Sequence, residues 1–224
     1  MSDSHRNEIT IGRIIGGLYL LQFVSGILVN VVLTAPLSGT PGFITNGAVY
    51  AHQIGISALV SFLIGISAIA IAVMAYPVFR VRSHSLALGF LALAIAGLAA
   101  TIMEVIGTMS LVSFSKTFSQ AGVAQQDLLE SVKPVVASFR TWAHYSNILF
   151  SGVGLLVLYT MLYRFSLVPR VIGGFGLIAV SLQLGTIGAT FLGQAVNFTL
   201  LAPLALSQVA LIIWLLAKGF KPKS

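Results

Sequence analysis

The sequence has no cysteine and few charged residues. The absence of Cys among 224 residues excludes disulfides, thiolate metal sites and a catalytic cysteine. Only 8% of the residues are charged, whereas a soluble domain carries roughly 25%. With 57% hydrophobic residues and a mean hydropathy of +1.00, this composition excludes a soluble fold and leaves no room for a soluble catalytic module.

Six apolar runs of membrane-spanning length follow one another along the chain. Each has roughly 20 residues, which as a helix cross a hydrocarbon core of about 30 Å at about 1.5 Å per residue. The sequence therefore predicts an all-α polytopic membrane protein, a bundle of six transmembrane helices in a single domain over residues 1–224. The predicted spans lie near 12–34, 55–78, 86–112, 141–164, 169–192 and 199–217.

The basic residues mark one side of the membrane. Nine of the 12 Lys and Arg residues lie before the first span, in alternate gaps or after the last span: Arg6, Arg13, Arg80, Arg82, Arg164, Arg170, Lys218, Lys221 and Lys223. Because cytoplasmic connections carry the excess of Lys and Arg, this pattern predicts a multi-pass protein of the inner (cytoplasmic) membrane with both termini cytoplasmic. The net charge of +7 follows from this asymmetry, so the lipid bilayer is the predicted partner and nucleic acid is not.

The gap at 113–140 is the exception, because it carries Lys116, Lys133 and Arg140. Long connections weigh less in the rule, so the predicted topology stands. Apolar and polar residues alternate within this gap as in a short amphipathic helix near 120–132. We expect that helix to lie on the outer surface and cap the bundle, with Pro134 kinking or stopping it before the fourth span.

Most strongly polar side chains inside the spans lie toward the predicted outer ends: Asn30, His52, Gln53, Glu104, Arg140, His144 and Asn147. On the fourth span Arg140, His144 and Asn147 recur at helical spacing, and Thr101 and Glu104 do so on the third. Gln183 begins a similar stripe on the fifth. Because unsatisfied polar groups in hydrocarbon cost several kcal/mol, the stripes are predicted to face one another around an outward-facing pocket.

Glu104 is the only acidic residue within a predicted span. It is either a proton acceptor or ligand counter-charge, or the partner of Arg140 or His144 in an ion pair that joins two helices. His52, Glu104 and His144 would also supply the two-His, one-carboxylate set of catalytic zinc or non-haem iron. Haem between His52 and His144 stays open as well. The sequence contains neither a Gly-x-Ser-x-Gly elbow nor a His-Glu-x-x-His motif.

Glycines recur near the predicted inner ends of the first and fifth spans: Gly12, Gly16, Gly17, Gly173, Gly174 and Gly176. Gly185 and Gly188 lie deeper in the fifth span. Small residues let helix backbones approach closely, so these positions predict helix packing, and homo-oligomers through the same faces stay open.

Two segments resemble a known family. They are Tyr163–Gly173, which reads YRFSLVPRVIG, and Leu211–Lys221, which reads LIIWLLAKGFK. Together they resemble the bacterial membrane family catalogued as domain of unknown function 4386, over nearly the whole chain. The resemblance implies a six-helix fold and singles out Glu104 and His144. The chain departs from the family where an arginine often precedes the glutamate, at Thr101, and it lacks a glutamate in the last span. No activity follows from the resemblance.

The sequence thus predicts an integral membrane protein whose outward-facing polar pocket, between the third, fourth and fifth spans, binds a small molecule or ion. Glu104, His144 and Asn147 are the predicted ligand contacts, with Arg140 at the mouth. Three alternatives stay open: a metal- or haem-dependent intramembrane enzyme using His144 with His52 or Glu104, a transporter, and an accessory subunit whose polar residues only pack. No cofactor is required by the sequence, and an enzyme is not favoured.

Overall fold

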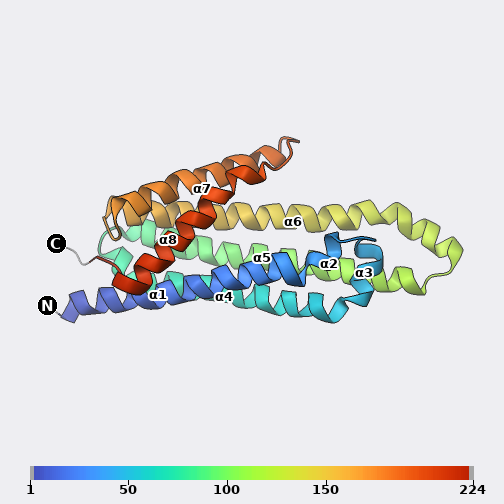
Figure 1. The fold of residues 1–224 in the computed structure, drawn as a ribbon, viewed down its shortest axis with the longest axis horizontal. Helices are drawn as coiled ribbons and strands as arrows, with labels where there is room; N and C mark the ends of the chain where they lie inside the picture. The colour runs from blue at the N-terminus through green and yellow to red at the C-terminus, as the bar shows by residue number, and fades with distance from the viewer. Residues whose placement is uncertain (1–2, 222–224) are drawn as a thin grey trace. The chain divides into compact units, whose positions relative to one another are not determined.

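The computed structural model describes residues 3–221, with side chains from Arg6 onward, and every regular element in that range is a helix. The elements are α1 (Asp3–Ile27), η1 (Leu28–Leu33, a π-helix), α2 (Ala35–Ser38), α3 (Phe43–Val49), α4 (Ala51–Arg80), α5 (His84–Gln120), α6 (Val123–Arg164), α7 (Arg170–Thr190), η2 (Phe198–Leu200) and α8 (Ala202–Lys218) (Figure 1). Lys223, one of the basic residues that predicted the topology, lies outside the described range.

Six helical segments are long and apolar enough to cross a membrane: Arg6–Leu33, Ala51–Arg80, His84–Gln120, Val123–Arg164, Arg170–Thr190 and Phe198–Lys218. Each corresponds to one predicted span. The prediction of an all-α protein with six membrane-spanning helices is confirmed, and the chain is a multi-pass membrane protein.

The connection predicted at 113–140 is helical almost throughout. α5 runs on to Gln120, and α6 begins at Val123 and continues through Pro134 into the fourth span. The predicted surface helix near 120–132 is therefore the first part of α6 and not a separate element. A proline inside a helix removes one backbone hydrogen bond, and α6 continues on both sides of Pro134.

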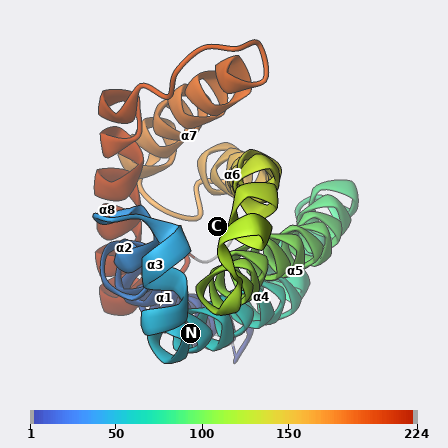
Figure 2. The ribbon, with the colours of Figure 1, turned by 90° about the vertical axis from the view of Figure 1, so that its right-hand side faces the viewer.

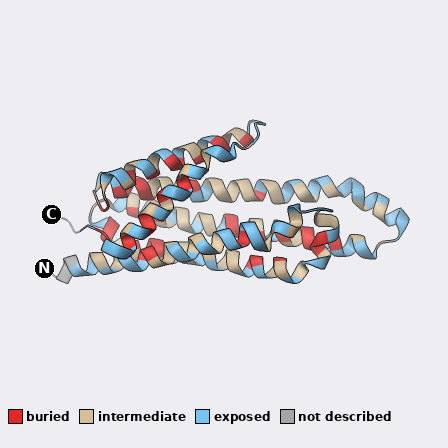
Figure 3. Ribbon diagram, in the orientation of Figure 1, coloured by how far each residue is buried: buried red, intermediate tan, exposed pale blue. Residues whose placement is uncertain are grey.

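The chain divides into two compact units. The first unit comprises Met1–Phe23, Ser67–Gly97 and Ile148–Ser224, and the second comprises Val24–Ile66 and Leu98–Asn147. The helices α1, α4, α5 and α6 each contribute one part to each unit. The core of the first unit is built on large, fully buried side chains, among them Phe79, Tyr159 and Phe220. In the second unit, no residue of α6 before Ala143 is buried (Figure 3).

Close packing in the first unit depends on glycine at several positions, four of which belong to the glycines singled out in the sequence. A Cβ on Gly12 of α1 would overlap the backbone at Phe220, and one on Gly16 would lie 2.9 Å from Cβ of Leu215 in α8. Gly173 and Gly176 of α7 pack in the same way on Tyr163 and Tyr159 of α6. α7 and α8 lie side by side (Figure 2).

The structure thus confirms close packing at these four positions. At Gly174 a Cβ would make only ordinary contact with the ring of Tyr163. The prediction is wrong at Gly17, Gly185 and Gly188, where a Cβ would meet nothing within 4 Å.

In the second unit, α3 is anchored to α5 by Ser115. The Ser115 hydroxyl donates to the carbonyl of Ile44 at 2.5 Å and accepts from the backbone N–H of Ala48 at 2.7 Å. A Cβ on Gly47 would lie 2.8 Å from Cβ of Ser115, so the two helices approach closely there. Gln53 of α4 similarly donates to the carbonyls of Val32 and Leu33 at the end of the π-helix.

Candidate functional site

Within the second unit, Glu104 of α5 faces two polar side chains of α6. His144 Nδ1 lies 2.7 Å from Glu104 Oε1, and Asn147 Nδ2 donates to Glu104 Oε2 at 2.6 Å. Thr101 Oγ1 donates to Asn147 Oδ1 at 3.3 Å. We call Thr101, Glu104, His144 and Asn147 the polar cluster. Because residues three or four apart share a helix face, each helix presents its two members together.

A glycine one turn beyond Glu104 allows α5 and α6 to come this close. A Cβ on Gly107 would lie 3.0 Å from Cα of Arg140, tighter than ordinary packing. Arg140 precedes His144 by one turn. The close approach of the helices at Gly107 and Arg140 therefore fixes how near the side chain of His144 comes to that of Glu104. The α5–α6 crossing thus determines the geometry of the polar cluster.

The carboxylate and imidazole are only partly shielded. The side chain of Glu104 is 20% exposed and that of His144 is 25% exposed. Both oxygens of Glu104 are occupied by protein groups, one by each α6 residue. Arg140 lies within electrostatic range of Glu104, and its Nε is buried without a hydrogen-bond partner. The cluster therefore holds the imidazole of His144 against Glu104, and the unsatisfied guanidinium N–H of Arg140 lies within electrostatic range of the same carboxylate.

His52 is not part of this cluster. It lies on the exposed stripe of α4 that also carries Ile56 and Leu59, whereas the buried face of that helix carries Ile54 and Ser57. No three His, Cys, Asp or Glu side chains gather as a metal site would require within the described part of the chain. The structure thus does not assemble His52, Glu104 and His144 as ligands, because the helical period turns His52 onto the exposed face.

The polar residues of the fifth span, in α7, belong to the first unit and have partners there. Gln183 donates to the carbonyl of Ile148 at 3.4 Å, and Thr186 Oγ1 accepts from the backbone N–H of Asn197 at 2.9 Å. Thr190 donates to the carbonyl of Ile187 in its own helix. The predicted third wall of the pocket therefore uses its hydrogen-bonding groups to hold α7 to its neighbours and to the loop that follows it.

A family model described as "Domain of unknown function (DUF4386)" matches residues 14–219. The chain belongs to this family. The match confirms the resemblance carried by Tyr163–Gly173 and Leu211–Lys221. No curated protein and no solved structure matches the chain. The description of the family names no activity for this DUF4386 protein.

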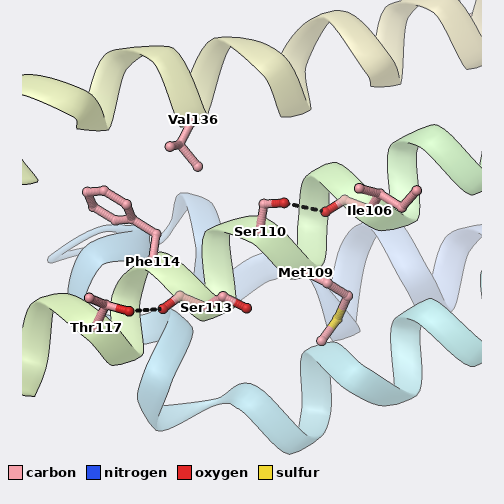
Figure 4. A pocket seen from close by; sticks show the side chains of 7 residues that line it. All are labelled: Ile106, Met109, Ser110, Ser113, Phe114, Thr117 and Val136. Carbon is pink, nitrogen blue, oxygen red and sulfur yellow. Dashed lines mark hydrogen bonds between the residues drawn. The ribbon is translucent and has the colours of Figure 1, made fainter.

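The DUF4386 chain also has an open groove that sequence reasoning missed. It measures about 460 Å³ and lies within the second unit, lined by Ile106, Met109, Ser110, Ser113, Phe114, Thr117 and Val136 (Figure 4). Val136 comes from α6 and the other residues from α5. A sequence signal for this groove does exist. Spacings of four, three and four residues place four of its residues on one face of α5: Ile106, Ser110, Ser113 and Thr117.

Proposed function

We propose that this DUF4386 protein is a multi-pass protein of the bacterial cytoplasmic membrane that binds a small polar molecule or ion at the polar cluster. His144 and Asn147 would contact the ligand, Glu104 would orient them and supply the counter-charge, and Arg140 would stand at the mouth. The observation that carries the proposal is the pairing of Glu104 with His144 Nδ1 at 2.7 Å. An intramembrane carboxylate marks a functional site by default.

Pairing through Nδ1 determines what His144 offers to a ligand. A carboxylate accepts hydrogen bonds and does not donate them when ionised, so Nδ1 carries the hydrogen that Glu104 accepts. A neutral imidazole then presents a lone pair at Nε2, which can accept a hydrogen bond or a proton from a ligand. The proposed ligand therefore bears a donor group or is a cation.

Arg140 favours a ligand that also bears an acceptor. A buried donor left unsatisfied costs about 1–3 kcal/mol. An acceptor atom of a bound molecule near Nε of Arg140 would remove that cost. The combined preference is for a small polar molecule with a donor and an acceptor.

Thermal unfolding of the purified protein in mild detergent, with a panel of small polar metabolites and inorganic ions, tests the proposal. A stabilising compound should lose its effect in His144→Ala and in Glu104→Ala and keep it in the control Val132→Ala, an exposed position of the same helix. Unchanged stabilisation in both cluster variants would contradict it. An absorption spectrum and elemental analysis of the same sample test the metal and haem alternatives directly.

A packing role is the second candidate, and one observation favours it. Both oxygens of Glu104 already have protein partners, as expected if the cluster only joins α5 to α6. Replacing a buried polar group together with its partners by apolar residues of similar volume is often neutral or stabilising. The combination Glu104→Leu with His144→Leu and Asn147→Leu should then retain stability and any cellular function.

A further inference from the structure

Three basic residues of the first unit belong to one short turn and to the segment bonded to it. Arg164 ends α6, and Arg170 begins α7 and donates from Nε to the hydroxyl of Ser166 at 3.4 Å. Lys221 follows α8, and its backbone N–H donates to the carbonyl of Leu167 at 2.8 Å, so the end of α8 lies beside the turn between α6 and α7 (Figure 1). We call Arg164, Arg170 and Lys221 the basic cluster.

The basic cluster has no carboxylate partner. All three residues are exposed. Among the side chains that the structure describes in the first unit, Glu8 is the only carboxylate, and it pairs with Arg82. Arg13 of the same unit differs from the cluster, because it donates to the carbonyl of Ala217 at 3.1 Å. Exposed cations without a carboxylate beside them attract an anionic ligand.

Buried neighbours hold the backbone of the basic cluster in place. Leu167 and Val168 of the turn are fully buried, and Phe220 is 1% exposed beside Lys221. Lys221 Nζ lies 5.6 Å from the ring centroid of Trp214 in α8. Because the turn and the segment after α8 are already ordered, a ligand that contacts both loses little binding free energy to ordering them.

An apolar strip of α7 leads away from the basic cluster. Val171, Phe175 and Ile178 share a helix face and are 82%, 39% and 63% exposed. α7 has 21 residues, about the number that crosses the hydrocarbon core, which places Arg170 at the boundary of that layer. Phe175 and Ile178 then lie about 8 and 12 Å deeper, at about 1.5 Å per residue. The apolar strip thus lies within the hydrocarbon layer, and the basic cluster lies at its edge.

We propose that the basic cluster binds the phosphate of one anionic phospholipid, whose acyl chain packs on the apolar strip of α7. Arginine pairs with phosphate through two parallel hydrogen bonds, and lysine binds it as a point charge. A zwitterionic phospholipid carries an ammonium group that the cluster repels, so the site prefers an anionic headgroup. A free phosphate ion gains nothing from the apolar strip, whereas an acyl chain does.

Native mass spectrometry of the full chain, released from nanodiscs of phosphatidylglycerol and phosphatidylcholine in equal amounts, tests the proposal. The expected result is one retained phosphatidylglycerol in preference to phosphatidylcholine. Arg170→Gln and Lys221→Gln should each lower this retention about fivefold, as for one basic residue near an anionic lipid surface. Lys133→Gln is the matched control, because it removes one exposed cation from the other unit, and it should leave retention unchanged.

Two further comparisons test the acyl chain. Phe175→Ala should lower the retention of phosphatidylglycerol about threefold through lost apolar contact, whereas Ile213→Ala, at a position 62% exposed on α8, should not. Glycerol phosphate carries the phosphate without acyl chains, and at the same concentration as the lipid it should not displace it. Displacement would identify a general phosphate site and overturn the lipid as occupant.

Equal retention of the two lipids would overturn the proposal. An equal loss in Lys133→Gln and Arg170→Gln would overturn it too, because retention would then follow net charge alone. Size-exclusion elution and helical content check each variant for folding, and Arg164→Gln takes the place of a variant that fails that check. Glu104→Gln should retain the lipid, and its loss there would show that binding depends on the polar cluster and not on the basic cluster.

Discussion

Glu8 of α1 and Arg82, which follows α4, form a bidentate ion pair within the first unit. Arg82 donates to both carboxylate oxygens, at 3.2 and 2.8 Å, and to the carbonyl of Val78 at 2.7 Å. The two side chains are well shielded, with Arg82 4% exposed and Glu8 13% exposed. In the sequence, Arg82 served only to predict the topology. In the structure it links the first helix to the turn between α4 and α5.

Removing Glu8 should therefore destabilise the protein. Glu8→Ala leaves a buried guanidinium without its counter-charge, a change that typically costs about 3–5 kcal/mol. The expected readout is a lower unfolding temperature in detergent. Arg80→Ala, an exposed cation at the end of α4, is the matched control and should change stability by about 0.5 kcal/mol or less. Equal stability of the two variants would show that the ion pair contributes nothing.

Two glycines of α1 should respond in opposite ways to alanine. At Gly12 a methyl group would overlap the backbone around Phe220, so Gly12→Ala must push the chain after α8 away and should cost about 1–3 kcal/mol. At Gly17 there is open space, and the change should stabilise the helix by up to about 1 kcal/mol. Both values come from reversible unfolding of the purified protein. A stabilising Gly12→Ala would contradict the close approach of α1 to the chain end.

Ser115 should matter more than other serines of α5. Ser115→Ala removes the donor to Ile44 and leaves the N–H of Ala48 without its partner, at an expected cost of about 1–3 kcal/mol. Ser119, an exposed residue one turn further on, donates only to its own helix, so Ser119→Ala should be nearly neutral. Hydrogen exchange of the α3 amides gives a local readout, and unchanged protection in Ser115→Ala would refute the anchoring role.

The sequence predicts helices better than it predicts helix faces. The six spans could be predicted from the lengths of the apolar runs. That Glu104 and His144 face each other could be predicted from their helical spacing and from the cost of exposing charge to lipid. The grouping of His52 with them rested on predicted depth and on the chemistry of metal ligands, and neither says which way a side chain turns. The buried Ile54 and Ser57 place His52 on the opposite, exposed side of α4.

The connection between the third and fourth spans shows a second limit. Its mixed polar composition predicts a surface element, yet α5 and α6 extend as helices of 37 and 42 residues joined at Ala121 and Gly122. Composition reports the environment of a segment, and it does not report whether the backbone continues a helix. The groove could not be predicted for the same reason, because it depends on how Val136 aligns with the stripe from Ile106 to Thr117.

The absence of cysteine makes the predicted orientation directly testable. A single Cys introduced into this chain is the only thiol available, so labelling of intact cells by a membrane-impermeant maleimide has no background from the protein itself. The charge pattern predicts that the turn after α5 lies outside and that the turn after α6 lies in the cytoplasm. Gln120→Cys should be labelled in intact cells, and Ser166→Cys should be labelled only after the membrane is permeabilised. The reverse pattern would invert the topology and, with it, place the polar cluster and the groove toward the cytoplasm.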